Sequence, residues 1–302
     1  MPSSIPIPAG RNSQLLGAAS SSQLERMAAQ LALRAGKLAA SGLSGLFASR
    51  FPGRGLEFSE LLEYQDGDDA ASIDWLASLR SSRLYRKSYH EERELPLILA
   101  CDCSASLYSQ PALLELLRQS AALFAACAAL SQDSFSLLFF SEALELALPL
   151  GRGQRQLRRV ASRLCHFKPR WKGTNLAAFC QLLQRVNKRP SRLFIFSDLR
   201  CTGYHGALSR LTAKHQVLVC HLATESIKAE LPQNLWLALE DPESQRKSLL
   251  QASALHELAP EQNQSRQHEI LATGAEYLRL DEHRPLLQQL FNYFRQTAKP
   301  PA

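Results

Sequence analysis

Five oxygen-bearing side chains stand where predicted strands end or where a predicted helix begins. An Asp-x-Ser-x-Ser motif follows the apolar run 95–101, one aspartate follows a second apolar run, and one threonine opens a helix. Carboxylate and hydroxyl oxygens are hard ligands that suit Mg²⁺, although Asp and Ser also cap helices. We expect a divalent cation at this set: Asp102, Ser104, Ser106, Thr174 and Asp198.

An alternating pattern of strands and helices must position these residues. The fold class we expect is α/β, with a doubly wound, mostly parallel, Rossmann-like sheet and right-handed crossovers. Ligands of such sheets bind outside the carboxyl ends of the strands, which is where the five residues fall. The predicted strands cover 95–101, 135–140, 144–148, 193–196, 216–222 and 276–280; the predicted helices cover 111–130, 154–164, 176–186, 206–214 and 285–297.

The first 94 residues have a different character. Residues 1–20 are rich in Ser, Pro and Gly, residues 24–38 have the apolar spacing of a helix, and residues 53–94 are rich in turns and aromatics, with a predicted strand near 83–89. The expected division is an N-terminal helical and β extension over 1–94, wrapped on a domain over 95–302.

The metal motif and its placement resemble the metal-ion-dependent adhesion site of von Willebrand factor type A domains, over roughly residues 95–222. This resemblance implies that Ser104, Ser106 and Thr174 supply hydroxyl oxygens, while Asp102 and Asp198 act directly or through water. It also implies that a carboxylate from a partner completes the coordination of Mg²⁺. Such a site recognises a protein without turnover.

A second pattern lies upstream and resembles the bacterial family called domain of unknown function 58. The signature comprises Glu57, Phe58, Tyr64, Gly67, Asp68, Asp69, Asp74, Trp75 and Arg80. This resemblance implies an adaptor or chaperone-like role with a MoxR-type AAA+ ATPase. From the residues alone, the acidic run is a good solvated turn, and Asp74 with Arg80 is predicted to form a buried ion pair.

Composition and cysteine usage limit the compartment. The chain has 302 residues, 45% of them hydrophobic, and its seven cysteines form no framework, which favours reduced thiols in the cytoplasm. The N-terminus lacks the pattern of a secretory signal, and the apolar runs read as buried elements. We therefore expect a soluble cytoplasmic protein without membrane contact.

The net charge of +7 comes from one short segment. Residues 151–172 hold eight basic and no acidic side chains, and the rest of the chain nets −1. We expect these residues to rim the metal site and to steer an acidic protein surface, in preference to binding nucleic acid. The predicted rim is Arg152, Arg155, Arg158, Arg159, Lys168, Arg170 and Lys172.

The alternative to a binding module is a metal-dependent hydrolase that uses the same carboxylates to activate water. The sequence contains no His-Glu-x-x-His, no Walker A lysine loop and no Gly-x-Ser-x-Gly elbow. We therefore expect no enzymatic activity and no catalytic residue.

Overall fold

The computed structural model describes the chain over residues 21–51, 56–65, 68–69, 73–81, 83–91, 95–224, 236–240, 247–251 and 264–297. The chain forms two compact units. One comprises residues 1–50 together with 95–302, and the other comprises Phe51–Glu94. The division differs from the expected one, because residues 21–50 belong with the sheet rather than with the following segment.

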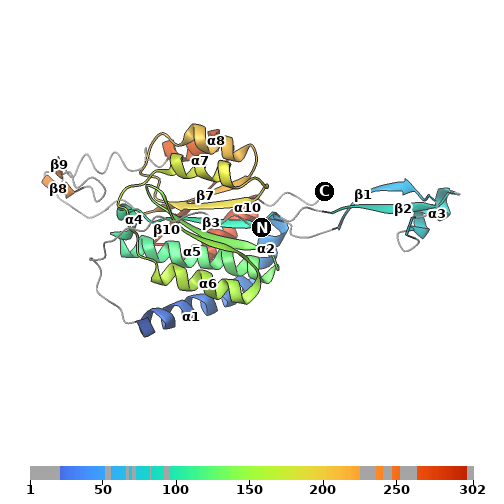
Figure 1. The fold of residues 1–302 in the computed structure, drawn as a ribbon, viewed down its shortest axis with the longest axis horizontal. Helices are drawn as coiled ribbons and strands as arrows, with labels where there is room; N and C mark the ends of the chain where they lie inside the picture. The colour runs from blue at the N-terminus through green and yellow to red at the C-terminus, as the bar shows by residue number, and fades with distance from the viewer. Residues whose placement is uncertain are drawn as a thin grey trace. The chain divides into compact units, whose positions relative to one another are not determined.

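A six-stranded sheet forms the centre of the larger unit (Figure 1). Its spatial order is β10-β7-β6-β3-β4-β5; five strands are parallel and β5, at one edge, is antiparallel. The strands are β3 (Leu97–Asp102), β4 (Phe135–Phe140), β5 (Leu144–Gly151), β6 (Arg192–Ser197), β7 (Gln216–Ala223) and β10 (Glu276–Asp281). The predicted mixed α/β class with a mostly parallel sheet is confirmed.

The order of the strands reverses at the centre of the sheet. The chain runs from β3 outward through β4 and β5, then returns to the other side of β3 and runs outward through β6 and β7. The neighbours β3 and β6 therefore form the switch point, the place where open α/β sheets bind their ligands.

Helices cover both faces of the sheet (Figure 1). One face is covered by α7 (Leu176–Val186), α8 (His205–Thr212) and a helix over 264–272. The other face is covered by α2 (Ser44–Arg50), α5 (Pro111–Leu130) and α10 (Leu286–Thr297), and α6 (Gly153–His166) packs beside α5. A short helix, α4 (Ala105–Tyr108), follows β3 directly.

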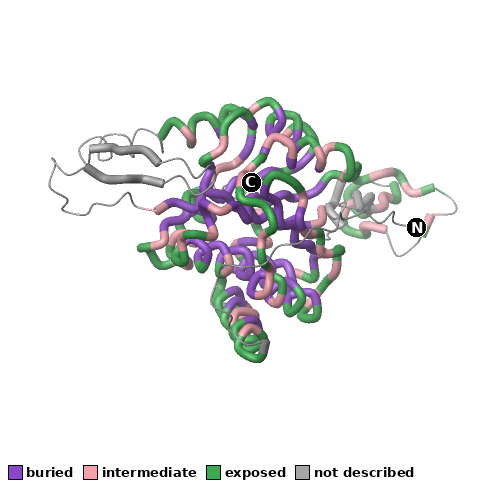
Figure 2. The backbone as a smooth tube through the Cα atoms, turned by 60° about the vertical axis from the view of Figure 1, so that its left-hand side comes forward, coloured by how far each residue is buried: buried purple, intermediate pink, exposed green. Residues whose placement is uncertain are grey.

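Continuous apolar runs explain the burial of the central elements. Every residue of β3, β4 and β6 is buried, as parallel strands covered on both faces must be (Figure 2). Among the described helices, α5 is the one long and apolar enough to span a membrane, and 78% of its apolar window is buried in the fold. In this structure α5 is a core helix, with the ring of Phe124 4.9 Å from that of Phe194 on β6.

The N-terminal helices pack against other helices of the larger unit. The first, α1 (Ser21–Leu38), lies against α5 and α6, and a π-helical segment (Ala39–Leu43) connects it to α2. At the kink Gly42 has a φ of 106°, a conformation that favours glycine. Phe47 of α2 is fully buried against Phe194 and Phe294, so this helix is part of the core.

The smaller unit is a hairpin with one short helix. Its strands β1 (Leu56–Glu63) and β2 (Tyr85–Glu91) pair antiparallel, and α3 (Trp75–Ser81) lies between them in sequence. The strand predicted near 83–89 corresponds to β2, whereas β1 was not predicted. A second two-stranded sheet, β8 (Trp236–Glu240) with β9 (Lys247–Gln251), belongs to the larger unit.

Candidate metal centre

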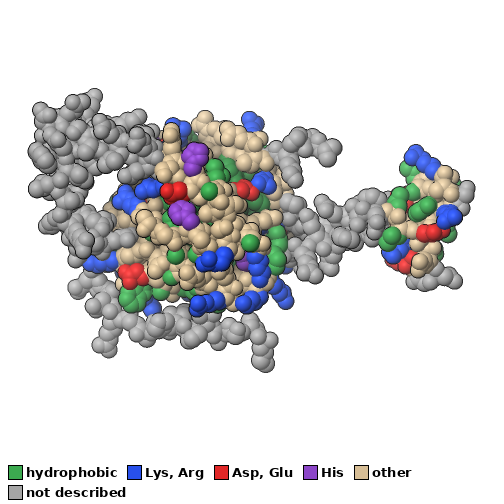
Figure 3. All heavy atoms as spheres, turned by 90° about the horizontal axis from the view of Figure 1, so that it is seen from above, with side chains coloured by type: hydrophobic (Ala, Val, Ile, Leu, Met, Phe, Trp, Pro, Cys, Tyr) green, Lys and Arg blue, Asp and Glu red, His purple; other side chains and the backbone are tan. Residues whose placement is uncertain are grey.

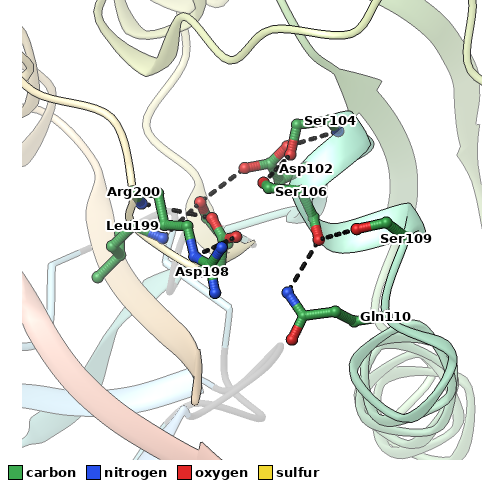
Figure 4. A network of polar contacts seen from close by, with 9 residues as sticks. Asp102, Ser104, Ser106, Ser109, Gln110, Asp198, Leu199 and Arg200 are labelled. Atoms are coloured by element: carbon green, nitrogen blue, oxygen red, sulfur yellow. Dashed lines mark hydrogen bonds and ion pairs between the residues drawn. The ribbon is translucent and has the colours of Figure 1, made fainter. Parts of the chain in front are cut away.

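The two predicted acidic ligands lie at the carboxyl ends of β3 and β6, on the two sides of the switch point (Figure 4). Asp102 is fully buried, and its Oδ1 accepts a 2.9 Å hydrogen bond from the backbone N of Ser104. Its Oδ2 accepts a 2.7 Å hydrogen bond from the hydroxyl of Ser197, the last residue of β6. The parallel register of the two strands thus brings residues 95 positions apart into contact.

The serine hydroxyls of the motif lie side by side. The Oγ atoms of Ser104 and Ser106 are 3.0 Å apart, and both residues are buried at the start of α4. In Figure 4 both side chains lie beside Asp102. Ser104 occupies the N-cap position of α4, but its side chain makes no capping hydrogen bond. The helix-capping explanation of the motif is therefore not the one that the structure adopts.

Asp198 brings a second negative charge to the same place. It is 4% exposed, and its charge raises the pKa of Asp102. Burial is the larger cause of that shift, and together they raise the pKa of Asp102 from 3.8 to about 7, although hydrogen bonds from Ser104 and Ser197 act in the opposite direction. The Oδ2 atom of Asp198 is buried without a hydrogen-bond partner.

The loop that carries Thr174 is tied to this site on both sides. The backbone N of Ala105 donates to the carbonyl of Lys172 over 2.8 Å, and the N of Asn175 donates to the carbonyl of Ser141 over 2.9 Å. Thr174 itself is half-buried. All five residues predicted as ligands therefore belong to segments that meet at the carboxyl end of the sheet.

This arrangement fits a hard divalent cation. Two buried like charges lie close together, one carboxylate oxygen lacks a hydrogen bond, and the adjacent groups are hydroxyls, all of which a cation bound by oxygen ligands would satisfy. In the described part of the chain, no three His, Cys, Asp or Glu side chains lie together in a way that could hold a metal ion. A cation held here would therefore need hydroxyl ligands in addition to the two carboxylates.

Two glutamates that the sequence analysis missed position the Thr174 loop. Buried Glu145 accepts hydrogen bonds from the backbone N of Arg170 at 2.7 Å and from the Ser141 hydroxyl at 2.5 Å. Glu142 accepts one from the N of Gly173 at 3.0 Å, and a Cβ at that glycine would lie 2.8 Å from the same carboxylate. Their only sequence signal is their position just after the strand next to β3.

A buried histidine on the neighbouring strand contacts the backbone of Asp198. His221 of β7 hydrogen-bonds the backbone of Asp198, and its Nδ1 lies 2.6 Å from the Tyr277 hydroxyl on β10. Burial lowers the pKa of His221 from 6.5 to about 3, and Arg266 and Arg279 add to the shift, so the ring is neutral. Sequence reasoning assigned it no role, because nothing in the spacing links positions 198, 221 and 277.

The basic segment is exposed, but the structure divides it between the two ends of the sheet. Gly151 pairs with Phe135 at the amino end, and Arg152 donates to the carbonyl of Gln132 there. Arg152 and Arg155 therefore do not rim the site, contrary to our expectation; Arg158 and Arg159 follow along α6. The exposed basic residues of the loop at the carboxyl end are Lys168, Arg170 and Lys172.

The other side of the sheet shows no such run among the described residues. Figure 3 views the molecule from the side of α7 and α8, where Lys and Arg side chains are scattered in small groups among neutral ones.

In the smaller unit, the described residues of the upstream signature have local structural partners. Tyr64 donates its hydroxyl to the Asp68 carbonyl at 2.9 Å, and Asp68 pairs with Arg86 at 2.9 Å. Asp74 caps α3, accepting from the backbone N of Leu76 and Ala77 at 3.0 and 3.1 Å.

The predicted buried ion pair of Asp74 with Arg80 is wrong, because Arg80 is exposed; Trp75 is also 63% exposed. Asp69 is exposed as well, in keeping with a solvated turn. Gly67 lies outside the described residues, and Glu57 and Phe58 are described only through the backbone of β1.

One known protein family matches more than half of the chain. The family described as "Protein of unknown function DUF58" matches residues 60–268. This chain belongs to that family. The match spans most of the hairpin unit and most of the sheet, and it confirms the family resemblance that the sequence alone indicated.

Three mycobacterial proteins are similar to this chain in sequence. Uncharacterised proteins of Mycobacterium tuberculosis and Mycobacterium bovis are 27% identical over 208 residues, which cover 67% of this chain. The chain spans only 65% of the length of these relatives.

Two solved structures are similar. One is an aerotolerance-related membrane protein from Bacteroides fragilis and the other is BatB from Bacteroides thetaiotaomicron, with sequence identities of 15% and 16%. Each has a TM-score of 0.44 and covers 67% of this chain and 99% of the other.

Proposed function

We propose that the larger unit is a von Willebrand factor type A-like domain whose metal-ion-dependent adhesion site binds Mg²⁺ and, through it, a partner protein. The observation that carries the proposal is the pair of buried carboxylates at the switch point. Asp102 and Asp198 end neighbouring strands, and the Oδ2 of Asp198 has no hydrogen-bond partner. Buried carboxylates in purely structural positions are closely paired and hydrogen-bonded, so this pair is one that a bound cation would satisfy.

The chemistry of the donor set favours recognition over hydrolysis. Asp102 and Asp198 would hold the ion directly or through water, with hydroxyls from Ser104, Ser106 and Thr174. Because hydroxyls leave most of the charge of Mg²⁺ uncompensated, the bound ion would attract a carboxylate from outside as a further ligand. We therefore propose a binding module without catalytic turnover.

The exposed charges around the site suit an acidic partner. Lys168, Arg170 and Lys172 lie on the loop held by Glu142 and Glu145, next to Thr174. Positive side chains beside the ion would raise the association rate of a negatively charged surface. They would also add to the attraction that the ion exerts on that surface.

The partner we propose is a MoxR-type AAA+ ATPase, for which this cytoplasmic chain would act as an adaptor or chaperone-like component in assembling or activating a protein complex. Support for this partner comes from the family resemblance in the signature, which the match over residues 60–268 strengthens. The acidic surface would belong to the ATPase or to its client.

A pull-down with the purified ATPase tests this function. Immobilised wild-type chain should retain the ATPase in Mg²⁺ and release it in EDTA, and Asp102→Ala should fail to retain it in either. Glu25→Gln, which removes an exposed carboxylate from α1, is the matched control and should behave as wild type.

Capture that survives both EDTA and Asp102→Ala would overturn the metal bridge. Mg²⁺-dependent phosphatase turnover that Asp198→Ala abolishes would replace the binding module with the hydrolase. Salt-sensitive binding to random duplex DNA, lost when Arg155, Arg158 and Arg159 are neutralised, would favour a nucleic-acid ligand instead.

A further inference from the structure

A positively charged side chain of this protein, Arg200, already contacts one member of the carboxylate pair. Arg200 follows Asp198 by two residues, and its Nε lies 3.4 Å from the Oδ2 of Asp198 (Figure 4). Its backbone N also donates to the Oδ1 of Asp198 at 3.3 Å. The Arg200 side chain is 48% exposed, whereas Asp198 is 4% exposed, so the guanidinium approaches a buried carboxylate from the solvent side.

The backbone between these two residues is built to bring them together. Leu199 has a φ of 54°, a left-handed conformation that leucine rarely adopts. Its side chain is buried, and its backbone N donates to the Ser197 hydroxyl at 3.1 Å, which is the same hydroxyl that donates to Asp102. The resulting tight turn places Arg200 next to Asp198, and the Ser197 hydroxyl connects the same turn to Asp102.

The contact between Arg200 and Asp198 is loose. At 3.4 Å the Nε atom makes no hydrogen bond to Oδ2, which remains without a hydrogen-bond partner. A half-exposed arginine in such a contact gains little from it, because water competes for both groups. A divalent cation that compensates the charge of Asp198 in its place can therefore displace the guanidinium.

We propose that Arg200 is the internal counter-ion of the metal site: it neutralises Asp198 until a divalent cation displaces it, and the released guanidinium then takes part in holding the carboxylate of the partner. This inference rests on the proposed function, since it needs the divalent cation. It adds a coupling between the two ligands. The metal frees Arg200, and a partner carboxylate that holds Arg200 away from Asp198 strengthens metal binding in return.

The proposal predicts effects of opposite sign from one substitution. Arg200→Gln removes a charge that competes with the cation, so the cation should bind more tightly. The same substitution removes a carboxylate-binding group, so an acidic ligand should bind more weakly in saturating Mg²⁺. A surface ion pair without a role in the site would produce neither effect.

Mn²⁺ binding, measured by electron paramagnetic resonance on the full chain, tests the first effect. Arg200→Gln should lower the Kd for Mn²⁺ about tenfold, because a unit charge next to a divalent ion is removed. Arg189→Gln is the matched control: this exposed arginine precedes β6 by three residues, at the amino end of the sheet, and its Kd should stay within about twofold of wild type. Lys172→Gln, which removes a charge next to the site but outside the pair, should also change it only about twofold.

Poly-L-glutamate in saturating Mg²⁺ tests the second effect. Its affinity should fall about threefold in Arg200→Gln and stay unchanged in Arg189→Gln. Circular dichroism in EDTA checks that each variant is folded, and Arg200→Ala repeats both measurements with a second side chain.

The outcomes separate this inference from the function beneath it. If neither the wild-type chain nor any variant binds Mn²⁺, the metal site itself is refuted, and the inference with it. If wild type and Arg200→Gln bind Mn²⁺ with equal Kd, the metal site stands and the counter-ion role is overturned. Tighter Mn²⁺ binding with unchanged poly-L-glutamate affinity would overturn the part of Arg200 in holding the partner.

Discussion

The two ends of the central sheet both contain buried charged side chains, but the charges are opposite at one end and alike at the other. At the amino end, Arg192 of β6 and Asp133 before β4 are 1% and 2% exposed and form an ion pair of 3.2 Å. At the carboxyl end, Asp102 and Asp198 place two negative charges together, and the side chain of Arg200 contacts Asp198 only loosely. The same layers of helices cover both ends of β3 and β6, so burial alone does not explain the difference.

The comparison teaches which buried charges hold the fold and which serve a ligand. In a buried pair of opposite charges, the attraction within the chain offsets the cost of desolvation. In a buried pair of like charges, that cost is offset only when another group, such as a bound cation, supplies the opposite charge. This difference supports the proposal that the carboxyl end is the end that binds a ligand.

Breaking the amino-end pair should have the largest effect on stability. Arg192→Met leaves Asp133 as a buried charge without its arginine, so we expect the free energy of unfolding to fall by about 3–5 kcal/mol. Urea denaturation followed by circular dichroism measures this change. The double variant Arg192→Met with Asp133→Leu should recover much of the loss, and failure to recover any would show that the pair is not the cause.

Adding metal should stabilise the carboxyl end and leave the amino end as it is. At a Mg²⁺ concentration 100 times the Kd, the free energy of unfolding should rise by about 2.7 kcal/mol, because only the folded chain assembles the site. Thermal unfolding with Mg²⁺ or EDTA measures the gain. Asp198→Asn should abolish it, and Arg192→Met should retain it at a lower melting temperature; a gain that persists in Asp198→Asn would place the ion elsewhere.

Removing the charge of Asp102 should stabilise the metal-free protein, whereas removing the charge of Arg192 should destabilise it. Folding raises the pKa of Asp102 from 3.8 to about 7, so the folded state holds a proton in that range that the unfolded state has lost. Its contribution to stability is complete below pH 3.8 and disappears as the pH rises through 7. In EDTA at pH 8, Asp102→Asn should raise the free energy of unfolding by roughly 1–3 kcal/mol.

The measurement is a pair of urea titrations at pH 8 and pH 5. The gain from Asp102→Asn should shrink at pH 5, where the wild-type carboxyl group is protonated. A variant that is less stable than wild type at both values would contradict the like-charge interpretation.

Sequence patterns predicted the central elements closely and for a clear physical reason. The strand predicted over 135–140 and the helices predicted over 111–130 and 176–186 are found with those bounds, because a buried strand or helix must be apolar along its length. The convergence of Asp102, Thr174 and Asp198 followed from the rule that parallel strands end at one edge of the sheet.

Features that depend on chain direction were beyond the sequence. Residues 151–172 run without interruption into Thr174, which suggested a continuous rim. Because β5 is antiparallel, α6 starts at the amino end instead, and its 14 residues extend about 20 Å before the chain returns to the site. The roles of Glu145 and Arg200 were hidden for a related reason: a carboxylate at the start of an edge strand and an exposed arginine carry no signal until their contacts are known.

The smallest effect should come from an exposed arginine in the hairpin unit, and it sharpens the contrast with Arg192. Arg80 is exposed on α3, while Asp74 spends its Oδ1 on the backbone of Leu76 and Ala77. Arg80→Ala should therefore change the free energy of unfolding by no more than about 0.5 kcal/mol. Asp74→Ala should cost about 1 kcal/mol through loss of the helix cap. Urea denaturation of both variants decides the point: a loss in Arg80→Ala as large as that in Asp74→Ala would restore the ion pair as the interaction that holds α3.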